Sequence, residues 1–97
     1  MEDDLEPVNY WTLVRSQSAM ADALCGIKKS ERSNRIRRGE FITPFSLGGG
    51  RAKAFFAGEL QEYPAAYANG ASNEEIREIV TRQLERRKYR LAQLRAS

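Results

Sequence analysis

Residues 26–51, GIKKSERSNRIRRGEFITPFSLGGGR, join a short basic segment to an apolar run and three consecutive glycines. Within residues 28–38, six bases stand against a single acid, Glu31. The order predicts a basic helix followed by a β-hairpin with Gly48-Gly49-Gly50 at its tip, because glycine accepts the positive φ values of a tight loop. A basic helix beside a cationic hairpin presents two positive surfaces to a nucleic-acid backbone. This stretch therefore predicts DNA binding.

Serines and glycines divide the flanking sequence into short helices. Ser16 or Ser18 can cap a helix that Gly26 stops. A second helix is predicted over residues 30–38, with Ser30 as its N-cap and the following glycine as its terminator. Two short helices separated by a glycine-containing turn have the helix-turn-helix spacing.

The apolar runs on either side of the glycine triplet predict two strands. Residues 41–47 (FITPFSL) contain a proline, which is typical of an edge strand. Residues 51–56 (RAKAFF) alternate, so a strand here would point its two cations and first phenylalanine to one side. The aromatic stretch over residues 10–14 is compatible with a short strand or with the lead-in to a helix.

The last third of the chain predicts two more helices. The first breaks near Pro64 and leads into a connector over residues 65–72, which contains an Asn-Gly turn signal. Ser72 and Glu75 form a capping-box pair that opens a long helix over residues 73–97. Its apolar stripe consists of Ile76, Ile79, Val80, Leu84, Leu91 and Leu94. The first half of this helix is expected to pack on the core, whereas the second half suits a dimer contact, a DNA arm or a frayed end.

The composition excludes several classes of protein. Ninety-seven residues, 41% of them hydrophobic, suit one small domain with a short appended element. There is no histidine and only one cysteine, Cys25, which excludes zinc fingers, Cys–His nucleophiles and a disulfide framework. Cys25 is expected to be a small buried residue. Paired carboxylates occur only at Glu59/Glu62 and within residues 74–78, where caps or solvated faces are expected. We therefore predict no catalytic site, no metal site and no cofactor.

Charge is distributed in blocks, although the net charge is only +3. Residues 1–6 hold four acids and no base, so residues 1–10 are expected to form an acidic flexible tail. Residues 82–95 hold six bases and one acid, and a solvated helix face is the favoured interpretation of this block. No apolar run approaches membrane-spanning length. We expect a cytoplasmic, nucleoid-associated protein without a membrane partner.

The order of these signals resembles the AlpA-like and excisionase-type regulators, small winged-helix proteins related to the MerR DNA-binding domain. The resemblance covers roughly residues 13–63, and its most specific part is Arg38-Gly39-Glu40-Phe41 followed by Pro44, Leu47-Gly48-Gly49 and Arg51. The chain departs from the family pattern at Arg32 and Arg35, which stand where apolar residues usually face the first helix.

The resemblance implies a mainly α fold with a small β-hairpin, namely a winged helix-turn-helix over residues 11–64 plus a C-terminal helix. It also implies that the second helix enters the major groove of double-stranded DNA while the wing contacts the backbone. The residues expected to contact DNA are Lys28, Lys29, Ser30, Ser33, Asn34, Arg37 and Arg38 of the helix, Arg51 and Lys53 of the wing, and Gly48, Gly49 and Gly50 at its tip. The implied function is sequence-specific regulation in a phage or integrated mobile element, either of transcription or as an excisionase-type directionality factor.

The two unusual arginines motivate an alternative. Unpaired Arg32 and Arg35 would be costly to bury, so the winged domain could be degenerate and the C-terminal helix could mediate assembly. In this hypothesis the chain is a protein-interaction adaptor. Both hypotheses are compatible with a homo-oligomer, formed on DNA or through the C-terminal helix, and neither requires a small-molecule cofactor.

Overall fold

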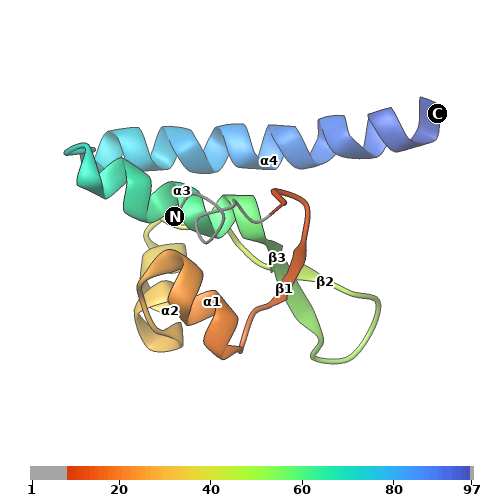
Figure 1. The fold of residues 1–97 in the computed structure, drawn as a ribbon, viewed down its shortest axis with the longest axis horizontal. Coiled ribbons are helices and arrows are strands. Elements are labelled where there is room, and N and C mark those ends of the chain that lie inside the picture. The colour runs from red at the N-terminus through yellow and green to blue at the C-terminus, as the bar shows by residue number, and fades with distance from the viewer. Residues whose placement is uncertain (1–8, 97) are drawn as a thin grey trace, which may run out of the picture.

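The computed structural model describes residues 9–96, and these form four helices and one three-stranded antiparallel sheet (Figure 1). In chain order the elements are β1 (Leu13–Arg15), α1 (Ala19–Cys25), α2 (Lys29–Arg37), β2 (Phe45–Ser46), β3 (Lys53–Phe56), α3 (Ala57–Ala68) and α4 (Asn73–Ala96). The predicted mainly helical fold with a small β element is confirmed. Most of the predicted acidic tail lies outside the described residues, but Tyr10 at its end is ordered and packs directly on Gly58 of α3.

The sheet has β3 at its centre, in the order β1-β3-β2. Leu13 lies opposite Phe56, and Phe45 lies opposite Ala54. The predicted hairpin is therefore present. Residues 13–15, whose sequence is compatible with a strand or with a helix lead-in, form the third strand, β1, because they pair with a segment about forty residues later in the chain. The strand predicted over residues 41–47 is wrong except for its two strand residues in β2.

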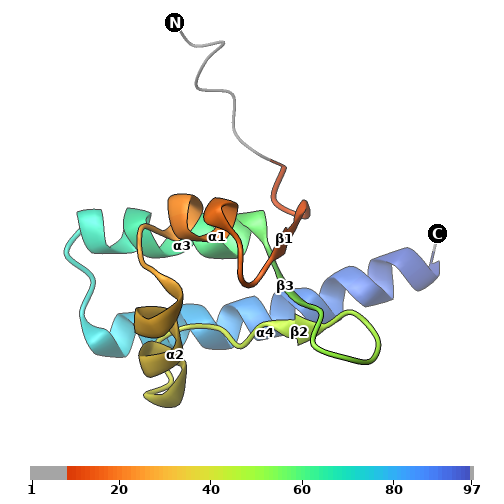
Figure 2. The same ribbon diagram turned by 90° about the horizontal axis from the view of Figure 1, so that it is seen from below.

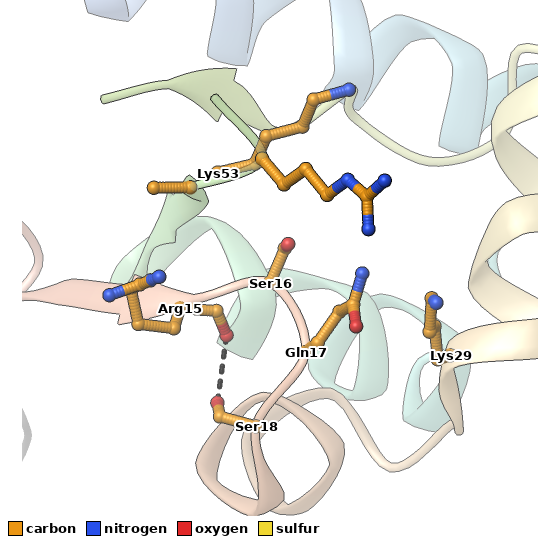
Figure 3. Close-up of a pocket in the computed structure, with 8 residues that line it drawn as sticks. Arg15, Ser16, Gln17, Ser18, Lys29 and Lys53 are labelled. Carbon is orange, nitrogen blue, oxygen red and sulfur yellow. Dashed lines mark hydrogen bonds between the residues drawn. The ribbon is translucent and has the colours of Figure 1, made fainter. Parts of the chain in front are cut away.

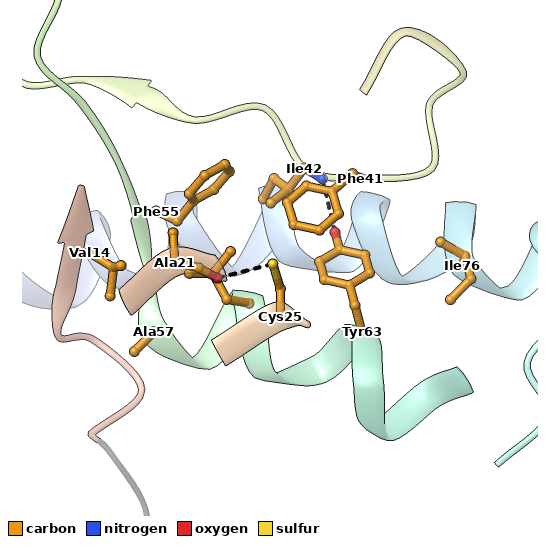
Figure 4. Packing of buried hydrophobic residues seen from close by; sticks show 10 residues of the cluster. Val14, Ala21, Cys25, Phe41, Ile42, Phe55, Ala57, Tyr63 and Ile76 are labelled. Atoms are coloured by element: carbon orange, nitrogen blue, oxygen red, sulfur yellow. Dashed lines mark hydrogen bonds between the residues drawn. The ribbon is translucent and has the colours of Figure 1, made fainter. Parts of the chain in front are cut away.

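Phe41 and Ile42 belong to a loop whose side chains enter the core (Figure 4). The Phe41 ring stacks on Tyr63, with centroids 4.2 Å apart, and meets Phe55 edge-on at 5.6 Å. Cys25 is free and buried in this cluster, as predicted. Burying the loop residues uses their apolar side chains for packing, so they do not extend the edge strand.

The helix boundaries follow local caps at α1 but not at α2. Ser18 accepts a hydrogen bond from the Ala21 N–H at 3.1 Å, and Gly26 ends α1 with a φ of 78°. α2 has Lys28 as its N-cap residue, without a side-chain cap, so the prediction of Ser30 as N-cap is wrong. The helix starts earlier because Arg32 donates to the Ile27 carbonyl at 2.7 Å and fixes the chain just ahead of Lys28.

α3 runs through Pro64 to Ala68, so the predicted break near this proline is wrong. Proline removes one N–H from the helix ladder, but Tyr63 and Ala66 on either side of it pack against the core and keep the helix continuous. The connector predicted over residues 65–72 is accordingly shorter and spans residues 69–72, with Gly70 at a φ of 77°.

α4 opens with the predicted capping box. The Ser72 N–H donates to Glu75 Oε1 at 2.9 Å, and the Glu75 N–H donates to Ser72 Oγ at 3.2 Å. The bond from the Ser72 backbone lowers the pKa of Glu75. Ile76 then enters the core, and Gln83, about two helical turns further along the same face, is fully buried as well. The first half of α4 therefore packs on the domain, as predicted.

Bases in the second half of α4 fasten it to the sheet and α3. Arg87 makes a bidentate ion pair with Glu59, with N···O distances of 2.6 and 2.9 Å, and its guanidinium lies 4.9 Å from the Phe45 ring centroid. Arg86 pairs with Glu62 at 3.0 Å, and Arg90 lies over the Trp11 ring. For these three bases the solvated-face interpretation is wrong. Of the two expectations for Glu59, the solvated face is wrong because the residue is fully buried, whereas the cap is confirmed, since its Oε1 accepts from the Phe56 N–H at the start of α3 at 3.0 Å.

The Tyr63 hydroxyl links three parts of the chain. It accepts a hydrogen bond from the Ile42 N–H at 2.9 Å and donates to Gln83 Oε1 at 2.6 Å. Gln83 in turn donates to the Glu59 carbonyl at 3.1 Å. The loop, α3 and α4 therefore share one buried polar network, in which burial raises the pKa of Tyr63 well above its usual range.

We expect stability at alkaline pH to depend on Tyr63. Its pKa is higher in the folded protein than the value of about 10 in an unfolded chain, so its contribution is intact below about pH 10 and falls as pH rises beyond it. Tyr63→Phe should flatten this alkaline fall in the free energy of unfolding. It should also cost about 1–3 kcal/mol at neutral pH, because Ile42 and Gln83 lose a buried partner. Urea titrations at a series of pH values measure both effects, and equal alkaline slopes in the two proteins would contradict the expectation.

Candidate nucleic-acid interface

A basic groove runs between the start of α2, the β1–α1 turn and the hairpin (Figure 3). Its cavity has a volume of about 760 Å³. The described residues that line it include four cations and no acid, and they are Arg15, Ser16, Gln17, Ser18, Lys29, Arg51, Ala52 and Lys53. Two smaller cavities adjoin it, and all three are lined by Gln17 and Lys29. The three cavities therefore form one continuous surface, whose third part is also lined by Asp22, the partner of Arg32.

Hydrogen bonds between segments set the groove walls. The Ser16 N–H donates to the Lys53 carbonyl at 2.9 Å and joins the β1–α1 turn to the hairpin. Arg32 lies beneath the floor, 2% exposed, and donates to the carbonyls of Ser16 and Ile27, each at 2.7 Å. It also pairs with Asp22 of α1 at 2.6 Å. One buried guanidinium thus connects the turn, α1 and the start of α2.

The outer face of α2 carries most of the predicted contact residues. Lys29 and Ser33 line the cavities, and this exposed face continues through Ser30, Asn34 and Arg37. Arg37 donates to Asn34 Oδ1, so the two side chains predicted to read bases already lie together. Lys28 is exposed just before the helix but lines none of the three cavities described above.

The hairpin carries the other predicted residues. Gly48, Gly49 and Gly50 all have positive φ, at 94°, 80° and 65°, which only glycine adopts without strain in a run of three. Leu47 donates its N–H to the Ala52 carbonyl at 2.9 Å and closes the loop. The loop is exposed, and it places the wing cations on the side that faces α2.

Three bases of the basic segment are turned to structural partners. Arg32 is buried, and Arg35 pairs with Glu31 at 2.9 Å while donating to the Tyr67 hydroxyl of α3 at 2.9 Å. The bond from Arg35 lowers the pKa of Glu31. Arg38, predicted to contact DNA, donates to the buried Glu40 carboxylate at 3.1 Å. Arg77 at the start of α4 binds the other oxygen of that carboxylate at 3.0 Å.

Arg15 and Gln17 belong to the groove but were not among the predicted contact residues. Arg15 lies opposite Ala54 in the sheet, next to Lys53, so its place depends on the pairing of β1 with β3. The only local signal was a lone base between an apolar stretch and a cap serine, which is common on solvated surfaces. The sequence thus indicated Lys29, Arg51 and Lys53. The position of Arg15 beside them could not be predicted, because it follows from the strand pairing.

The described part of the chain contains no group of three or more His, Cys, Asp or Glu residues that could hold a metal ion. None of its helices is long and apolar enough to cross a membrane. Comparisons of the chain with family models, with curated proteins and with solved structures found no match.

Proposed function

We propose that this chain is a winged helix-turn-helix protein that binds double-stranded DNA. The observation that supports this proposal most directly is the basic groove. One of its cavities is lined by four cations and no acid, namely Arg15, Lys29, Arg51 and Lys53. A sugar-phosphate strand, with one negative charge per nucleotide, suits such a groove, and contacts of this kind orient a protein on the duplex. α2 would then lie in the major groove, with the glycine tip of the hairpin against the backbone.

Sequence preference would come from the exposed face of α2. Asn34 can donate to and accept from adenine, and Arg37 can bind guanine in a bidentate manner. Both side chains are exposed, as are those of Lys29 and Ser33 on the adjoining surface of the helix. The mutual hydrogen bond of Asn34 and Arg37 would be exchanged for bonds to bases, so the two side chains would act together in base recognition.

A narrower proposal rests on the resemblance to AlpA-like and excisionase-type regulators. The chain would act in a phage or integrated element, as a transcriptional regulator or as a recombination directionality factor. Both roles use the same DNA-docking surface, so the position of the bound sites distinguishes them. Genome-wide mapping of bound sites should place them at a promoter in the first case and beside an integrase attachment point in the second.

The adaptor alternative loses its main motive. It depended on Arg32 and Arg35 standing at positions expected to be apolar. Arg32 is buried with an acid and two carbonyls as partners, and Arg35 is held by Glu31 and Tyr67. Neither arginine therefore gives a reason to regard the α1–α2 unit as degenerate, and DNA binding is the preferred proposal.

Affinity for a labelled random-sequence duplex is expected to fall steeply with salt. Four groove cations correspond to a slope of log K against log salt of about −3 to −4 for each copy. Arg51→Ala should make this slope shallower by about 1, because it removes one phosphate contact. Arg82→Ala, which removes an exposed cation of α4, is the matched control and should leave the slope unchanged. Fluorescence anisotropy at several salt concentrations measures the slopes. Affinity that is absent or indifferent to salt would overturn the proposal.

A further inference from the structure

One side of α4 presents apolar side chains that the rest of the described chain leaves open to solvent. Leu84 is 43% exposed and Leu91 is 49% exposed. In a helix with 3.6 residues per turn, positions 80, 84 and 91 lie within about 40° of one another. We call these three residues the Leu84 face. It lies beside the face that Ile76 and Gln83 bury against the domain, and Val80 is at the boundary between the two.

The C-terminal end of α4 also extends past the other elements in both views (Figures 1 and 2). From Lys88 to Ala96, every residue except Arg90 is exposed. A helical segment this short is marginal in water without packing, although here it continues a longer helix. A partner along the Leu84 face would cover apolar surface and hold this end in place.

The charges along α4 select the direction of that partner. The first half, residues 73–84, carries three acids and two bases, whereas the second half, residues 85–96, carries five bases and one acid. Among the exposed side chains, Glu74 lies near the start and Lys88 and Arg95 lie near the end. A second α4 running in the opposite direction is therefore complementary to the first, while a parallel one would oppose bases to bases.

We propose that two copies of this chain form a symmetric dimer in which their α4 helices pack antiparallel through the Leu84 face. In the register that sets the two Leu84 side chains next to each other, Val80 lies opposite Lys88 of the second copy and within one helical turn of its Leu91. The same register sets Glu74 opposite Leu94 of the second copy, one residue from its Arg95. A single alignment thus brings both the apolar and the oppositely charged side chains within one helical turn of each other, and the two-fold axis makes each contact between different residues occur twice.

The proposed dimer depends on α4 alone and does not require that the chain binds DNA. If DNA binding also holds, the two basic grooves would be related by a two-fold axis and would suit an inverted-repeat site. Its test is made without DNA, so failure of the dimer and failure of DNA binding are separate results.

The first test is sedimentation velocity of the full chain over a wide concentration range. The wild-type protein should be a dimer that dissociates on dilution. Leu84→Glu combined with Leu91→Glu should be monomeric at concentrations where the wild type is dimeric, with an unchanged helical circular dichroism spectrum because both positions are exposed. Gln93→Glu, on the opposite side of the same helix end, is the matched control and should remain dimeric. A wild-type protein that is monomeric at every concentration would overturn the proposal.

The second test fixes the direction by charge exchange. Glu74→Arg or Arg95→Glu alone should raise the dimer dissociation constant about tenfold, because each creates two like-charge contacts in the symmetric pair. Combining them should restore the wild-type constant, since each contact again joins opposite charges. A double variant that is no tighter than the single variants would exclude the antiparallel register, as would a single variant that dimerises like the wild type.

Discussion

Arg87→Ala is expected to cost about 3–5 kcal/mol of the free energy of unfolding, the largest loss among the substitutions considered. Its partner Glu59 has a side chain with 0% exposure, so the variant leaves a buried carboxylate without its counter-charge. The Phe56 N–H, which donates to Glu59 Oε1 at 3.0 Å, does not neutralise that charge. Urea denaturation should show the midpoint falling with little change in slope, because the surface exposed on unfolding is nearly the same.

Arg86→Ala is the matched control for this loss. Arg86 is the next residue on the same helix and also makes an ion pair and an aromatic contact. Its side chain is 40% exposed and that of Glu62 is 33% exposed, so solvent can replace the pair and the cost should be about 1 kcal/mol. Equal losses in the two variants would show that burial of Glu59 does not decide the effect.

A second variant keeps the expectation testable if Arg87→Ala does not fold. Glu59→Gln combined with Arg87→Met removes both charges while leaving an oxygen to accept the Phe56 N–H. Replacement of a whole buried pair is far less costly than removal of one partner. This double variant should therefore be clearly more stable than Arg87→Ala, and a double variant that is equally unstable would indicate that lost packing, rather than a stranded charge, is responsible.

The α4 helix illustrates what a sequence can and cannot predict. Its start was predictable, because Ser72 and Glu75 act on one another within a single turn. The role of its bases was not predictable, because Glu59, the partner of Arg87, lies 28 residues away on another helix. A block of bases in a sequence resembles a solvated helix face whenever the acids that pair with those bases lie far away along the chain. Only packing shows which of these bases are neutralised.

The same distinction divides the basic segment of residues 28–38. Three of its six bases face an acid in the structure, namely Arg32 with Asp22, Arg35 with Glu31 and Arg38 with Glu40. Lys28, Lys29 and Arg37 remain on the exposed surface. Half of the charge of this segment is therefore paired with acids, although the side chain of one paired base, Arg38, is still 54% exposed. Arg15 on β1 adds to the exposed charge, because strand pairing carries it to the groove.

Arg32 is expected to contribute both to the stability of the fold and to the proposed DNA binding. Its guanidinium makes bonds of 2.6–2.7 Å to Asp22, to the Ile27 carbonyl and to the Ser16 carbonyl, and it supplies the contact that an apolar residue could not. We expect Arg32→Met to cost about 2–4 kcal/mol, because two backbone carbonyls lose charged donors. The cost should be smaller than for Arg87→Ala, since the Asp22 side chain is 41% exposed and can be solvated.

The effect of Arg32→Met on DNA affinity should exceed what unfolding explains. Without this side chain the β1–α1 turn and the start of α2 lose their common anchor, so Arg15 and Lys29 are no longer held at one spacing across the groove. Asp22→Asn, which keeps both carbonyl bonds and removes only the ion pair, should cost no more than about 1 kcal/mol and leave affinity nearly unchanged. Denaturation and anisotropy measured on the same samples, at a temperature where each variant is folded, separate the two effects. Wild-type affinity in folded Arg32→Met would show that the groove holds its shape without this arginine.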